Sequence, residues 1–304
     1  MKLETLHFIR ERYQRFPSLS YLFKKPSNSY VAQSVEVLKH EGIVKLSGLI
    51  SAEELALLQR DFEVASKNQI DVRSSTDEFV SEYHDPRQKF YASENPFKYS
   101  ETLVSICSNK TLNEVVDLYL RKKGYVHKAV SYRTLPGAEH GEGSSQWHHD
   151  AWGKRVNCMI LLADIEEGDQ YMTFIKGSHK IQHTFKEYAQ SRLKPEYCNG
   201  KLPLIEIAKA QGKAGDIYLF DPNGLHSGNR TNGRTRDVFI VNYSSDKSYF
   251  WGMDFPQEVD LAAMNNKENP FKLLLDYKKA NPNAGLLPKY YSWVDSLEHI
   301  KSWL

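Results

Sequence analysis

The segment QWHHDAW, residues 146–152, places two histidines and an aspartate side by side between two tryptophans. In an extended chain alternate side chains share a face, so His148 and Asp150 point one way and His149 points the other way. One imidazole and one carboxylate on the same face are either two ligands of a metal site or a hydrogen-bonded surface pair. If the site binds a metal, the pattern favours His148 over His149 as the ligand.

A third ligand is available in the segment AGDIYLFDPNGLHSGNRTNGRTR, residues 214–236. A strand that ends at Phe220 is followed by a Pro-Asn-Gly turn and then by His226. Two histidines and one carboxylate on one face of a metal are the facial triad of non-haem ferrous oxygenases. Arg236 begins the next strand, where its guanidinium either holds the carboxylate of a co-substrate or forms a salt bridge at a strand edge.

Helices are expected on both sides of this region. Residues 51–62 and 111–124 each combine a capping box with an apolar stripe on one face, and residues 290–304 form a third amphipathic stretch. The capping boxes are Ser51–Glu54 and Thr111–Glu114, and Gly124 is expected to end the second helix.

Short β-rich segments separated by glycine, proline and asparagine occupy the chain from residue 126. Their spacing predicts a sandwich or barrel. The expected strands are residues 126–135, 156–164, 171–175, 203–208, 215–221 and 237–243.

The expected organisation is a single domain over residues 1–304. It consists of a helical part over about residues 1–125, a barrel core over about 126–245 and C-terminal helices over about 255–304. The polar stretch of residues 71–100 is either a cover over a substrate site or a solvated loop. The candidate substrate-facing residues in it are Arg73, Tyr83, His84, Arg87 and Tyr91.

Composition bears on both the class of partner and the cellular compartment. The net charge of +2 and the lack of a basic stripe give no indication of nucleic-acid binding. The three cysteines are scattered, which favours a reducing compartment over a disulfide framework. The start of the chain is interrupted by charges, and no apolar run is long enough to span a bilayer. We therefore expect a cytoplasmic protein.

Four stretches of the chain resemble the phytanoyl-CoA dioxygenase-like (PhyH) family of Fe(II)- and 2-oxoglutarate-dependent oxygenases. The resemblance covers about Gly42 to Tyr243. Lys176 stands where the family usually has proline, and the spacing from Asn229 to Arg236 is one residue longer than usual. The four stretches are HEGIVKLSGLISAEELALL, LPGAEHGEGSSQWHHDAW, FIKGSHK and AGDIYLFDPNGLHSGNRTNGRTR.

This resemblance implies a mainly β fold with flanking helices: a double-stranded β-helix, or jelly-roll, cupin-like barrel, packed by N- and C-terminal helices. It implies Fe(II) bound by His148, Asp150 and His226, and 2-oxoglutarate held by Arg236. Because of the longer spacing, Arg234 remains an alternative anchor. The polar groups expected to help inside the barrel are Thr134, Asn157 and Ser227. His149 and His179 are expected to be structural, the latter as a hydrogen bonder in its loop.

The implied activity is oxidation of a C–H bond in a small molecule, with O2 as a second co-substrate and release of succinate and CO2. Halogenating relatives replace the carboxylate ligand with a small residue, so Asp150 favours hydroxylation or desaturation. The tyrosines and basic residues before the barrel favour a polar or anionic substrate. Two alternatives stay open: a cupin-like metalloenzyme that does not use 2-oxoglutarate, and a non-catalytic binding or sensor protein on the same scaffold.

Overall fold

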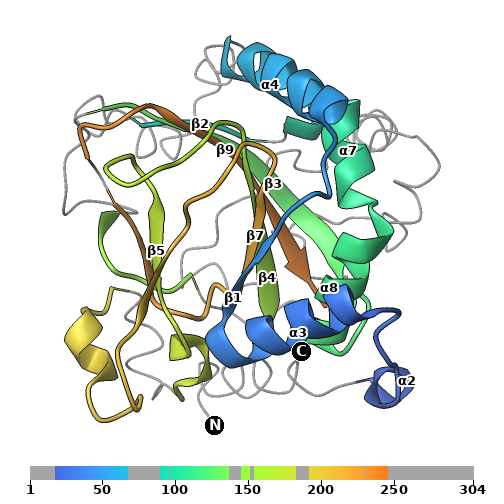
Figure 1. The fold of residues 1–304 in the computed structure, drawn as a ribbon, viewed down its shortest axis with the longest axis vertical. Helices are drawn as coiled ribbons and strands as arrows, with labels where there is room; N and C mark the ends of the chain where they lie inside the picture. Colours follow the sequence, from blue (N-terminus) through green and yellow to red (C-terminus); the bar gives the residue numbers. More distant parts are fainter. Residues whose placement is uncertain are drawn as a thin grey trace, which may run out of the picture.

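Two antiparallel β-sheets face each other, and helices cover the outer side of the larger sheet (Figure 1). This arrangement confirms the predicted jelly-roll fold with flanking helices. The computed structural model describes residues 18–67, 90–94, 96–136, 145–150, 154–182, 192–229 and 231–245. The C-terminal helices expected over about residues 255–304 lie outside the described residues.

The larger sheet has six strands in the order β1-β7-β4-β9-β3-β2. Two of its strands, β1 and β2, come from the chain before residue 126, so the sheet is completed by the N-terminal part. Its strands are β1 Ile43–Leu46, β2 Phe90–Glu94, β3 Tyr125–Thr134, β4 Arg155–Leu161, β7 Ile217–Phe220 and β9 Arg236–Ser244.

The smaller sheet has three strands in the order β6-β5-β8. Two isolated bridges extend it beyond β8, first to His148 and then from His148 to Arg192. The expected strand over residues 203–208 is found as the shorter β6, which begins four residues later and ends one residue later. The strands are β5 Met172–Ile175, β6 Ile207–Lys209 and β8 His226–Gly228.

The helix starts test the capping predictions. Helix α4 begins with the predicted box, since the Ser51 hydroxyl accepts the Glu54 N–H and the Glu54 carboxylate accepts the Ser51 N–H. The predicted box at Thr111 is wrong, because Asn109 caps helix α8 by accepting the Leu112 N–H. The α-helices are α2 Leu19–Leu22, α3 Ser29–Glu41, α4 Ala52–Lys67, α7 Glu101–Cys107 and α8 Lys110–Leu120; short 3-10 turns are Pro96–Lys98, Ser178–Lys180 and Pro195–Cys198.

The end of α8 also differs from the prediction. Arg121, rather than Gly124, takes the left-handed conformation that ends the helix, with φ 56°. The Gly124 N–H instead donates to the Asp117 carboxylate at 2.7 Å. A Cβ on Gly124 would lie 2.7 Å from Val116, so close packing against the helix explains the glycine.

Alternation along the strands of the larger sheet separates two cores. In β9, Phe239 and Val241 pack outward against the helices, whereas Val238 and Ile240 pack inward between the sheets. Cys158 belongs to the outer core, as expected of a small apolar residue. The inward face is therefore the face on which a barrel site can be built.

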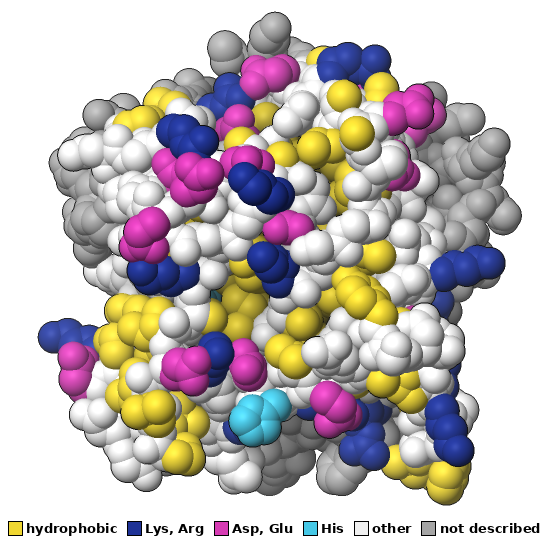
Figure 2. All heavy atoms as spheres, viewed as in Figure 1, with side chains coloured by type: hydrophobic (Ala, Val, Ile, Leu, Met, Phe, Trp, Pro, Cys, Tyr) yellow, Lys and Arg dark blue, Asp and Glu magenta, His cyan; other side chains and the backbone are white. Residues whose placement is uncertain are grey.

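The surface carries mixed charge. On the face drawn in Figure 2, basic and acidic side chains are interspersed. Within the described part of the chain, no helix has the length and hydropathy needed to cross a membrane.

Candidate active site

Three candidate ligands converge at one end of the smaller sheet. One ligand atom from each of His148, Asp150 and His226 lies within 4.8 Å of the others. Both histidines are buried, whereas the Asp150 side chain is 45% exposed. The structure therefore brings together the three predicted metal ligands, with the carboxylate on the accessible side.

Backbone pairing positions these side chains. His148 and His226 lie directly opposite each other, and each N–H donates to the other carbonyl at 2.9 Å. The Asp150 N–H donates to the Pro222 carbonyl at 2.8 Å. The segment that carries two of the residues is thus fixed to the turn and strand that carry the third.

Both imidazole rings are oriented by their Nδ1 atoms. His148 Nδ1 lies 2.7 Å from the Gln146 carbonyl oxygen, and His226 Nδ1 lies 2.9 Å from the Gly224 carbonyl oxygen. A carbonyl only accepts, so Nδ1 carries the proton and Nε2 presents its lone pair. The Nε2 atoms of His148 and His226 lie 3.3 and 3.5 Å from the two carboxylate oxygens of Asp150.

The electrostatic state suits a cation. Desolvation by the surrounding protein raises the pKa of Asp150, but the two histidines lower it more, so it lies well below its usual range. Burial, together with the nearby His226, lowers the pKa of His148. Burial also lowers the pKa of His226, but Asp150 raises it more and the net shift is upward. An ionised carboxylate beside a neutral His148 is the form in which these groups bind a divalent metal.

The turn before His226 is organised by a buried carboxylate that the sequence analysis did not single out. One oxygen of Asp221 accepts the Asn223 N–H and side-chain amide, at 2.9 and 2.6 Å. The other oxygen accepts the Tyr119 hydroxyl at 2.5 Å. The local sequence Asp-Pro-Asn-Gly signals such a turn, but the partner on α8 is 102 residues away.

The Gly-Ser-His turn supports the same region. The Ser178 hydroxyl donates to the Ile175 carbonyl and accepts the N–H of Leu225, the residue before His226. His179 Nε2 lies 3.2 Å from the Lys39 carbonyl, which confirms the expected loop-tying role.

Lys176, which stands where the family usually has proline, forms ion pairs with two carboxylates. Its ammonium lies 2.6 Å from Glu206 and 3.2 Å from Glu41. These contacts join the turn after β5 to the end of α3 and to the segment before β6.

Arg236 lies inside the barrel. It is 8% exposed and faces the same side of β9 as Val238, which belongs to the inner core. Thr134 is fully buried opposite it, with its hydroxyl 3.4 Å from Arg236 Nη2. Asn157 and Asn242 form a second opposed pair on this face, with Oδ1 and Nδ2 2.5 Å apart.

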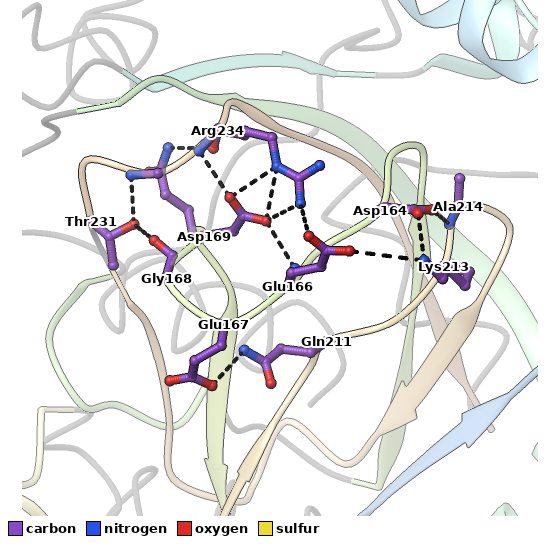
Figure 3. A network of polar contacts seen from close by, with 12 residues as sticks. Asp164, Glu166, Glu167, Gly168, Asp169, Gln211, Lys213, Ala214, Thr231 and Arg234 are labelled. Atoms are coloured by element: carbon purple, nitrogen blue, oxygen red, sulfur yellow. Dashed lines mark hydrogen bonds and ion pairs between the residues drawn. The ribbon is translucent and has the colours of Figure 1, made fainter.

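Arg234 lies elsewhere, in a surface network of ion pairs (Figure 3). Its side chain is 56% exposed, and Nη2 lies 2.5 Å from Asp169 and 3.1 Å from Glu166. The hydrogen bonds from Arg234 lower the pKa of Asp169 to about 2. Arg234 is thus engaged by the loop between β4 and β5, whereas Arg236 faces the interior.

One other predicted contributor, Ser227, is not brought to the site. Ser227 follows His226 in β8, so alternation places it on the opposite face, where its hydroxyl donates to the Ser145 carbonyl at 2.7 Å. His149, which was expected to be structural, is buried next to His148 and lies outside the cluster of ligand atoms. Of the expected cover residues, Tyr91 lies in strand β2; Arg73, Tyr83, His84 and Arg87 lie outside the described residues.

Comparison with known proteins agrees with this architecture. The chain is 25% identical over 230 residues to ectoine dioxygenases of Bordetella parapertussis and Bordetella bronchiseptica, covering 67% of this chain and 72% of each relative. EctD from S. alaskensis, solved with 2-oxoglutarate and 5-hydroxyectoine, has a similar fold, with a TM-score of 0.53 and 18% identity over 75% of this chain and 82% of that chain.

The epimerase SnoN, solved with Fe3+, alpha ketoglutarate and nogalamycin RO, is similar at a TM-score of 0.55 and 15% identity, covering 77% of this chain and 89% of that chain. Residues 38–238 match the model of the family described as phytanoyl-CoA dioxygenase. That match covers more than half of the chain and includes all three candidate ligands, so the chain belongs to the phytanoyl-CoA dioxygenase family.

Proposed function

We propose that the protein is an Fe(II)- and 2-oxoglutarate-dependent dioxygenase that hydroxylates a C–H bond of a small polar molecule and releases succinate and CO2. The observation that carries this proposal is the convergence of two Nε2 atoms and one carboxylate beside the smaller sheet of a jelly-roll fold. This donor set matches the facial triad of ferrous oxygenases.

His148, Asp150 and His226 are the proposed iron ligands. The Nδ1–H groups of the two histidines donate to backbone carbonyls and fix both imidazole rings, so the ligand geometry exists before the metal binds. When bound, ferrous iron and the keto acid supply the activation of dioxygen that no protein side chain provides. The protein contributes orientation, exclusion of water and the position of the substrate.

Arg236 is the proposed partner of the distal carboxylate of 2-oxoglutarate. Its burial and its position beside the Thr134 hydroxyl support a charge-assisted, bidentate contact inside the barrel. Asn157 shares this face of the sheet and is a further polar group for the co-substrate.

Asp150 determines which oxidation we propose. Its carboxylate occupies the place that a halide takes in halogenating relatives, so hydroxylation is the expected outcome. Ectoine, the compound named in two relatives, is a small polar molecule and is a suitable first probe in a substrate screen.

The screen should be read out by succinate release and by product mass. We expect one oxygen to be added to the product, and turnover to require both Fe(II) and 2-oxoglutarate. If the iron-loaded protein fails to bind 2-oxoglutarate without oxygen, the cupin-like alternative is correct. If no compound in a broad panel stimulates succinate release, the non-catalytic alternative is favoured, and a chlorinated main product would show that the inference from Asp150 is wrong.

We further propose that residues 1–304 form one catalytic domain in the cytoplasm. Strands β1 and β2 support the single domain, because they complete the sheet that carries Arg236. The three cysteines are all free and buried, which agrees with a reducing compartment.

A further inference from the structure

A row of side chains crosses the smaller sheet and ends at an arginine. Phe174 pairs with His226, His226 pairs with His148, and His148 pairs with Arg192. Directly opposed residues of antiparallel strands project from the same face of a sheet. Arg192 therefore projects from the face that carries both histidines of the candidate metal site.

The pairing type places Arg192 close to His148. The Leu193 N–H donates to the Trp147 carbonyl at 3.2 Å, which is the pattern that flanks a non-hydrogen-bonded pair. In such pairs the Cα atoms are roughly 4.5 Å apart and the side chains are closest. Arg192 thus lies directly across from His148, a proposed iron ligand, in the closer of the two antiparallel pair types.

Arg192 is also accessible. It is exposed, in contrast to Arg236, and the ion pairs found among the described residues include none to Arg192. Its guanidinium is therefore available to an incoming molecule next to the strand position of His148, whose partner Asp150 has a side chain that is also exposed.

We propose that Arg192 binds a carboxylate of the substrate and so holds the reacting C–H bond beside the metal site. This inference rests on the proposed function and narrows its substrate class to small carboxylates. The guanidinium is suited to this because it forms two parallel hydrogen bonds to one carboxylate. Arg236, on the opposite sheet and buried, remains the partner of the co-substrate.

A first experiment needs no knowledge of the substrate and uses acetate as the probe. Protein loaded with Mn(II) and 2-oxoglutarate is titrated with acetate, and the paramagnetic relaxation of the acetate protons is measured. We expect a saturable enhancement in the wild type that is at least about fivefold weaker in Arg192→Ala. Arg60→Ala removes an exposed arginine from α4 and serves as the matched control. An equal enhancement in wild type and Arg192→Ala would overturn the proposal.

A second experiment screens carboxylic acids and their primary amides as matched pairs for succinate release. We expect the acids to stimulate turnover more than the amides. For an active acid, Arg192→Ala should raise KM by about 10- to 100-fold, and Arg192→Lys should recover part of this loss. In Arg192→Ala, the concentration of 2-oxoglutarate that gives half the maximal rate should stay within about twofold of the wild-type value.

Two outcomes of this screen would reject the role of Arg192. The first is that the amides are as active as the acids, and the second is that Arg192→Ala raises the required concentration of 2-oxoglutarate and not the KM of the substrate. The proposed function fails separately, if the wild-type protein binds no Fe(II) or no 2-oxoglutarate, or if no compound of a broad panel stimulates succinate release.

Discussion

Replacing Arg236 with alanine tests which arginine holds the co-substrate. Arg236 is 8% exposed and has the buried Thr134 hydroxyl beside it, so a carboxylate paired with it is largely removed from water. A charge-assisted bidentate contact in such a place contributes about 2–4 kcal/mol. We therefore expect Arg236→Ala to weaken 2-oxoglutarate binding by about 30- to 1000-fold.

Calorimetric titration of 2-oxoglutarate into the anaerobic, iron-loaded protein measures this loss directly. Iron affinity should change little, because Arg236 is not one of the proposed ligands. Pyruvate lacks the distal carboxylate and should bind equally weakly to the wild type and to Arg236→Ala. Thermal denaturation of the variant shows whether the fold is intact.

Arg234→Ala is the matched control, since it removes an arginine only two residues away. The Arg234 side chain is engaged by Asp169 and Glu166 at the surface, so its loss should leave 2-oxoglutarate binding within about twofold. If Arg234→Ala loses the co-substrate and Arg236→Ala keeps it, the longer turn after Asn229 has moved the anchor and our reasoning is refuted.

Three further predictions concern the metal site. His148→Ala should abolish Fe(II) binding and His149→Ala should retain it, as measured by equilibrium dialysis with iron analysis. The reverse result would show that His149, not His148, is the metal ligand. Tyr119→Phe removes the hydrogen bond to Asp221, so it should lower the free energy of unfolding by about 1.5–3 kcal/mol and also weaken Fe(II) binding. Tyr21→Phe is the control, because it removes a tyrosine–aspartate hydrogen bond to Asp117 of α8 and should leave iron affinity unchanged. Gly224→Ala should lower the free energy of unfolding by about 1–3 kcal/mol and reduce iron affinity. The added Cβ would lie 2.1 Å from Phe174, whose ring stacks near His226. Unchanged iron binding would show that the turn accommodates the Cβ without moving His226.

Local rules predicted much of the site. Alternation alone separated His148 from His149, and the observed 3.3 Å contact between His148 and Asp150 confirms that these two share a side. The same rule places Ser227 on the face opposite to its neighbour His226, which explains why the predicted contribution of Ser227 finds no support in the structure.

The capping predictions show where local rules compete. Ser51 and Glu54 form the predicted reciprocal box. At α8, Asn109 stands two residues before Thr111 and caps the helix first. Glu114 then accepts hydrogen bonds from Ser27, a partner 87 residues away that no local pattern indicates.

Residues that act through distant partners could not be predicted from the sequence. Asp221 is recognisable as a turn residue, but its bond to Tyr119 on α8 depends on how the helix packs against the sheet. Arg192 lies in an irregular segment without strand periodicity, and only its bridge to His148 relates it to the site. Such contacts exist only after the sheets have paired.

The two arginines of the proposed site come from structurally different places, and this has a consequence for specificity. Arg236 lies in a nine-residue strand that pairs with β3 from Arg236 onward and with β4 from Val238 onward, so changing its position would disturb the larger sheet. Arg192 is joined to the smaller sheet by one isolated bridge at its edge. A substitution there alters the charge at the rim without breaking a ladder of backbone hydrogen bonds. The fold therefore holds the proposed co-substrate anchor rigidly, while the residue that we propose selects the substrate lies where the sequence can change at low structural cost.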